Sequence, residues 1–257
     1  MWNWFHKLAS PPHFYRIATL LEPWLLWPAI ALLLVGAYGG LVLAPPDYLQ
    51  GEGFRIIYVH VPAAFLSMFA YVLMAVASGI GLIWRMKLAF CVAAAAAPVG
   101  AAFTFLALVT GAIWGQPMWG SWWEWDPRLT SELILLFLFL GYIFLRQALR
   151  ETRQADRASG ILAVVGVVNV PIIHYSVEWW TSIHQGPTLV KMETPSIAGD
   201  MLWPLLVMIA GYQFLFFAIL MTGVRAQVLD REKNSRWVSA LLQTGRYEES
   251  PVEGLPG

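Results

Sequence analysis

Residues 119–132 read "WGSWWEWDPRLTSE" and contain four tryptophans within seven positions. On a short helix, Trp119, Trp122 and Trp123 would share one face with Asp126. An aromatic belt at a membrane surface explains scattered tryptophans, but it does not require so dense a run. A flat aromatic ligand would use it, because stacked or edge-on rings add roughly 0.5–1.5 kcal/mol each beyond area burial. We therefore predict that this cluster forms a ligand platform.

Two histidines in separate segments could coordinate one metal beside this platform. His60 lies in "RIIYVHVPAA" and His184 in "WWTSIHQGP". If the helix begins at Pro62, His60 lies at its mouth; if a kinked helix begins earlier, His60 lies about one turn inside. A lone histidine is more often hydrogen-bonded than metal-bound, and His174 in "PIIHYS" is a rival to His184.

Charged residues flank both segments. Asp126 followed by Pro127 is a typical helix start, with the acid as N-cap. Arg55 precedes the His60 segment and Arg128 follows the tryptophans. Their guanidinium groups could clamp the carboxylates of a ligand, which they bind bidentately, or contact lipid headgroups. Glu132 either faces the same site or reaches the membrane interface.

The composition indicates an integral membrane protein. Of the 257 residues, 58% are hydrophobic and only 12% are charged, with a mean hydropathy of +0.60. The net charge of zero gives no indication of nucleic-acid binding. The single cysteine, Cys91, excludes an internal disulfide and a Cys-x-x-Cys site. The sequence has no glycine-rich ATP-binding loop, so we expect no ATPase activity.

Six apolar runs are near the length that a spanning helix needs, about 20 residues. We therefore predict an all-α integral membrane protein with a bundle of six transmembrane helices in residues 1–240, and a disordered cytoplasmic tail over 241–257. The predicted spans lie near residues 24–43, 56–84, 88–114, 129–145, 158–177 and 201–224.

Lysine and arginine in the short loops predict the orientation, because cytoplasmic loops are enriched in them. Thirteen of the 16 basic residues fall on one side of the predicted spans. Only Arg55, Arg128 and Lys191 fall on the other side. Both termini are therefore predicted to be cytoplasmic, and the tryptophan cluster is predicted to lie outside the cytoplasm.

Two imidazoles, several indoles and two guanidiniums match the parts of a haem, whose iron commonly takes histidine as axial ligand. The sequence lacks Cys-x-x-Cys-His, so the haem would be held without thioether bonds. A second metal such as copper would need softer or more ligands than this face offers. Two other functions stay open: a haem permease, which vesicle uptake would reveal, and an electron-transfer cytochrome, which redox cycling with a quinone analogue would reveal.

Three segments carry a resemblance to a known family: "FRIIYVHVPAAF", "TGAIWGQPMWGSWWEWDPRLTSE" and "GVVNVPIIHYSVEWWTSIHQG". They resemble the cytochrome c maturation protein C family (CcmC, haem exporter protein C), whose tryptophan-rich segment is the WWD motif. The likeness extends to about residue 240. It implies a multi-pass protein of the bacterial inner membrane that presents non-covalent haem b on the periplasmic side. The implied partners are the haem chaperone CcmE, the ABC-type subunits CcmA and CcmB, and the small protein CcmD.

The resemblance also implies a role for individual residues. The family's axial histidines fall on His60 and His184, and its flanking arginines on Arg55 and Arg128. The WWD residues fall on Trp114, Trp119, Trp122, Trp123, Trp125 and Asp126. This sequence shows no departure from the family pattern at these positions.

Overall fold

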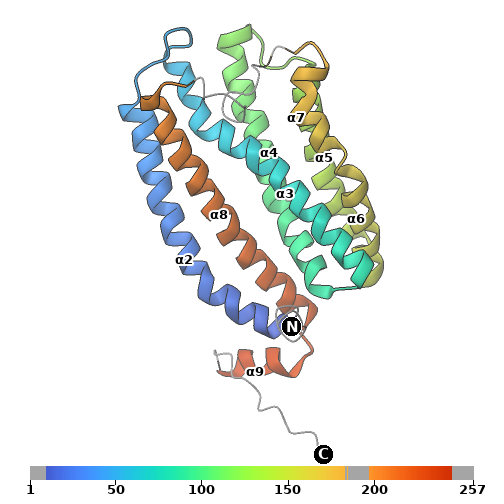
Figure 1. Cartoon of the computed structure of the whole chain (residues 1–257). Helices are drawn as coiled ribbons and strands as arrows, with labels where there is room; N and C mark the ends of the chain where they lie inside the picture. The colour runs from blue at the N-terminus through green and yellow to red at the C-terminus, as the bar shows by residue number, and fades with distance from the viewer. Residues whose placement is uncertain (1–9, 183, 185–196, 245–257) are drawn as a thin grey trace, which may run out of the picture.

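A computed structural model describes residues 10–182, 184 and 197–244, and folds them into a bundle of helices (Figure 1). No β-strand occurs in these residues. The predicted all-α class with six spans is confirmed. The stretches long and apolar enough to cross a membrane are Pro11–Leu43, Glu52–Trp84, Lys87–Trp119, Pro127–Ala148, Thr152–Trp179 and Gly199–Arg231.

Most of the helices extend beyond the predicted apolar runs into flanking polar residues, whereas α3 matches its predicted run within one residue. The elements are α2 (Pro11–Tyr38), the π-helix η1 (Gly39–Leu43), the 3-10 helix η2 (Glu52–Ile56), α3 (Ile57–Trp84), α4 (Lys87–Trp119), α5 (Pro127–Ala148), α6 (Thr152–Gly166), α7 (Asn169–Trp179), α8 (Gly199–Arg231) and α9 (Arg236–Thr244). Helix α9 includes the first residues of the predicted tail, and residues 245–257 lie outside the described part of the chain.

The fifth span is two helices rather than the single one predicted. Helix α6 ends at Gly166 and α7 begins at Asn169. Pro171 has no N–H for the carbonyl four residues before it, so the regular helical ladder is interrupted there. At this break the Asn169 side chain donates a hydrogen bond to the Ser131 carbonyl of α5, at 2.9 Å. The break gives α7 its own path toward the segment that carries His184.

Figure 1 shows α2 and α8 side by side, with α3 to α7 grouped beside them. The start of α2 and the end of α8 meet at one end of the bundle, next to α9; we call this the terminal end. The opposite end, where the α4–α5 connection lies, is the site end. Large buried rings fill the interior: Tyr71 of α3 packs against Phe139 of α5, and Phe216 of α8 packs against rings of α3 and α4.

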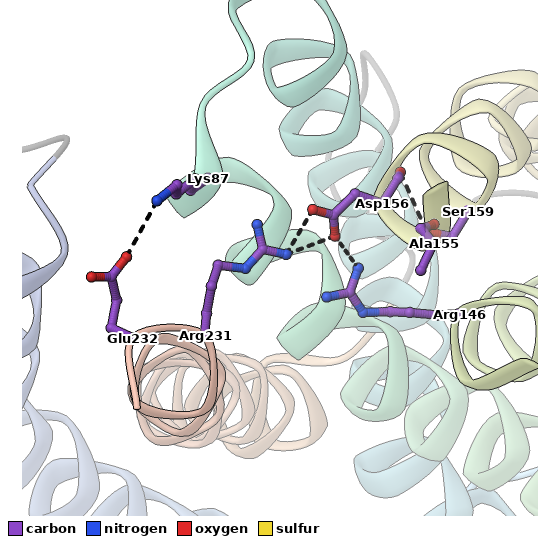
Figure 2. Close-up of polar contacts among 7 residues, drawn as sticks. All are labelled: Lys87, Arg146, Ala155, Asp156, Ser159, Arg231 and Glu232. Atoms are coloured by element: carbon purple, nitrogen blue, oxygen red, sulfur yellow. Dashed lines mark hydrogen bonds and ion pairs between the residues drawn. The ribbon is translucent and has the colours of Figure 1, made fainter. Parts of the chain in front are cut away.

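A buried carboxylate holds the terminal end together (Figure 2). Asp156 of α6 accepts hydrogen bonds from Arg146 of α5, at 2.5 Å, and from Arg231 of α8, at 2.7 Å to each carboxylate oxygen. Lys87, at the start of α4, pairs with Glu232 at 3.6 Å. These charges link four helices at the end of the bundle that is rich in basic residues.

Candidate functional site

A cavity lies at the site end between α3, α4, α5 and α7. Its empty space is about 510 Å³ when the open solvent at its mouth is included. Four of the ten predicted site residues line it: His60, Trp123, Arg128 and His184. The cavity continues inward along apolar residues of α3 and α7, which include Met68 and Ile173.

His60 lies about one turn inside α3, as predicted for a helix that begins before Pro62. The helix begins at Ile57 and runs through Pro62. The Nδ1 atom of His60 is 3.1 Å from the Ala107 carbonyl and 3.0 Å from the Thr110 hydroxyl, both on α4. A carbonyl oxygen only accepts hydrogen bonds, so this geometry assigns the proton to Nδ1. The lone pair of Nε2 is therefore available to a metal.

His184 also lines the cavity, from outside the helices. Its ring centroid is 5.3 Å from that of Trp119. Its buried Nδ1 has no hydrogen-bond partner among the described residues, and the Asp126 carboxylate is 3.9 Å away. Burial first, and then the positive charge of Arg128, lower the pKa of His184 from 6.5 to about 4. The ring is therefore neutral at pH 7, which is the form that coordinates a metal.

The segment between α4 and α5 is not the short helix considered for the platform. Helix α4 continues to Trp119 and ends at Gly120, whose φ of 78° is left-handed. Residues 121–126 are non-helical. The Ser121 hydroxyl donates to the Trp123 carbonyl at 2.7 Å and accepts from its N–H at 3.2 Å. The predicted N-cap is confirmed, because the Asp126 carboxylate accepts from the Arg128 N–H at 2.8 Å.

Because this segment is not helical, its tryptophans point in different directions. Trp114 and Trp119 pack edge to face at 5.0 Å, and the Trp114 indole donates to the Gln50 side chain at 3.1 Å. Trp123 lines the cavity, and its buried Nε1 has no partner in the described chain. Trp122 and Trp125 are 62% and 77% exposed. The tryptophans therefore do not form the expected single platform. Trp114, Trp119 and Trp123 are partly buried, and we call Trp122 and Trp125 the exposed pair.

The two predicted arginines have different surroundings, and only Arg128 lies at the cavity. Arg128 lines the cavity, and its guanidinium makes no hydrogen bond or ion pair with the described residues. Arg55 pairs with Glu52 and donates to the Gly40 carbonyl of η1 at 2.6 Å. Pro45 has no N–H to offer that carbonyl at the π-helical spacing, so Arg55 satisfies it instead. Arg55 therefore links η2 to η1 and does not line the cavity.

Other residues at the cavity had weak or no sequence signal. Glu132 faces the site, which was one of its two predicted positions, and accepts a hydrogen bond from Ser67 of α3 at 2.7 Å. Thr110 and Gly111 contact His60 but look like ordinary residues of an apolar helix. The rival histidine, His174, is exposed on α7 beside Tyr175 and does not line the cavity.

Comparison with known proteins gives a consistent family. A family model described as "Heme exporter protein C" matches residues 4–239. The relative of that name from Escherichia coli (strain K12) is 51% identical over 96% of this chain and 100% of its own length. The Haemophilus influenzae relative is 48% identical over 95% and 99%. The Bradyrhizobium diazoefficiens relative is 45% identical over 89% and 86%.

Proposed function

The chain belongs to the haem exporter protein C family, and we propose that it holds non-covalent haem b between His60 and His184 and delivers it to the chaperone CcmE during cytochrome c maturation. One observation carries the proposal: two imidazoles from separate segments, His60 and His184, line one cavity beside the Arg128 guanidinium. Bound haem would supply an iron that accepts one nitrogen from each ring.

The chemistry of the cavity residues supports this proposal. The buried Nε1 of Trp123 and Nδ1 of His184 have no partner among the described residues, and such groups cost free energy unless a ligand or water satisfies them. Arg128 can bind a propionate bidentately. The apolar side chains of Met68 and Ile173 suit the hydrocarbon edge of a macrocycle.

Coordination without a covalent bond makes the haem releasable, which delivery requires. We propose that CcmE docks on the exposed pair, Trp122 and Trp125, because both rings are exposed and Trp125 packs at 5.6 Å on Trp123, which lines the cavity. We propose that this chain only binds and releases haem, because its sequence has no glycine-rich ATP-binding loop. ATP hydrolysis in this proposal belongs to CcmA, which acts with CcmB and CcmD.

We further propose that the site end faces the periplasm of a bacterial cell with the protein in its inner membrane. The test is cysteine labelling, because the native Cys91 is 1% exposed and does not compete. An impermeant maleimide added to intact cells should label Leu49→Cys, at the site end, and not Gln147→Cys, at the terminal end. The reverse pattern would contradict the proposed orientation.

The haem assignment is tested by the Soret band of the purified protein. His60→Ala and His184→Ala should each shift or weaken the band, because each removes a nitrogen ligand. His174→Ala is the matched control and should leave it unchanged. If both cavity variants keep the position and intensity of the wild-type band, the axial assignment is wrong.

A further inference from the structure

We propose that Thr110 is a positioning residue for His60, whose hydroxyl fixes the imidazole for coordination; this inference rests on the proposed haem site. Thr110 lies on α4 and is 8% exposed. Neither the predicted platform nor the predicted ligand set includes it. Its hydroxyl contacts the His60 ring, which a valine side chain could not do.

The hydrogen bonds around Thr110 have a definite direction. Its hydroxyl donates to the Leu106 carbonyl, one turn earlier on α4, at 2.7 Å, and more weakly to the Ala107 carbonyl at 3.2 Å. The hydroxyl hydrogen therefore points along α4, and an oxygen lone pair is left for the His60 Nδ1–H at 3.0 Å. The Ala107 carbonyl accepts from the same N–H at 3.1 Å. Two acceptors thus share one ring hydrogen and limit rotation of the ring.

The backbone of α4 lets the ring reach these acceptors. A Cβ atom added to Gly111, the residue after Thr110, would lie 3.3 Å from Cε1 of His60. Glycine leaves that space to the imidazole, so the ring packs directly against α4. Residues 107 and 110 of α4 therefore supply two hydrogen-bond acceptors for the His60 ring of α3, and residue 111 leaves the space that the ring occupies.

This arrangement has a chemical consequence at the opposite ring nitrogen. Hydrogen bonds to the N–H of a ligating histidine fix its tautomer and raise its basicity, and losing such a partner typically costs about 10–100-fold in metal affinity. A more basic imidazole favours ferric over ferrous iron. The Thr110 hydroxyl should therefore strengthen ferric haem binding more than ferrous haem binding.

The experiment compares three variants of the full-length protein: Thr110→Val, Thr110→Ser and Thr104→Val. Thr104 is the matched control, because it is buried on α4 and its hydroxyl donates to the Gly100 carbonyl at 2.7 Å, whereas the His60 ring nitrogen bonds to Thr110. Thermal unfolding of the haem-free proteins checks that all three variants fold. The probes are ferric and ferrous haem b, added to the haem-free proteins and followed by absorbance.

Thr110→Val should weaken ferric haem binding by about 10-fold, at the low end of the expected range because the Ala107 carbonyl remains. It should also raise the midpoint potential of the bound haem, while Thr110→Ser and Thr104→Val behave as wild type. Equal losses for ferric and ferrous haem, or equal effects of the two valine variants, would overturn the proposal. If His60→Ala alters the Soret band and Thr110→Val alters nothing, this inference fails alone; if His60→Ala alters nothing, the haem assignment fails as well.

Discussion

Replacing Gly111 with alanine should separate haem binding from folding stability. The new methyl group would lie 3.3 Å from Cε1 of His60, which is closer than the roughly 3.5–4.0 Å optimum for carbon atoms. The ring must retreat by a few tenths of an ångström from acceptors now 3.0 and 3.1 Å away. Losing one such hydrogen bond costs about 0.5–1.5 kcal/mol. Haem affinity should therefore fall by up to about tenfold, since 1.4 kcal/mol is a factor of ten.

The same substitution should leave the stability of the fold nearly unchanged, because the gain of about 1 kcal/mol from alanine over glycine in a helix interior offsets the lost hydrogen bond. Haem titration in detergent measures the affinity, and thermal unfolding of the haem-free protein measures the stability. Gly79→Ala is the control: it makes the same exchange on α3, where the nearest atom, of Val164, is 4.0 Å away. Unchanged haem affinity in Gly111→Ala, with Gly79→Ala also unchanged, would show that close packing against α4 does not position His60.

Two further predictions concern the charged cluster and the tryptophans. Asp156→Ala leaves two largely buried guanidiniums without their counter-charge and should lower the free energy of unfolding by about 3–5 kcal/mol; denaturant unfolding measures it. Asp230→Ala, which removes an exposed pair, should cost about 0–1 kcal/mol, and equal losses would contradict the reasoning. Trp123→Ala should weaken haem binding in a titration, whereas Trp122→Ala should leave it intact, because only Trp123 lines the cavity. The opposite ranking would show that the exposed pair holds the haem.

Features that depend on local chemistry were predictable from the sequence. Each span follows from a long apolar run, because a buried backbone in lipid must form a helix. The start of α5 follows from Asp126 and Pro127, whose roles as N-cap and first helical residue need no distant partner. The length of α4 was not predictable in this way. Its last turn contains Pro117, which usually marks a helix boundary, yet the helix runs on to Trp119 and is capped by Gly120, several residues beyond the expected boundary.

Features that depend on a partner far along the chain were not predictable. Arg55 and Arg128 have equivalent sequence positions beside the two segments of interest. Arg55 satisfies a carbonyl that a π-helix and a proline leave free, 15 residues earlier, whereas Arg128 lines the cavity. Sequence spacing could propose both as clamps, but it could not show that one of them is needed elsewhere.

The ligand histidine and the residues that orient it follow different rules. His60 stands out in its sequence because it is an ionisable residue within an apolar span. Its hydrogen-bond partners do not stand out, because threonine, alanine and glycine are common wherever membrane helices pack closely. Their importance comes from the crossing of α3 and α4, which brings residues 107–111 against residue 60. A substitution at such a position changes coordination without changing any residue of the motif, so variants on α4 test this site more selectively than further variants of the tryptophans.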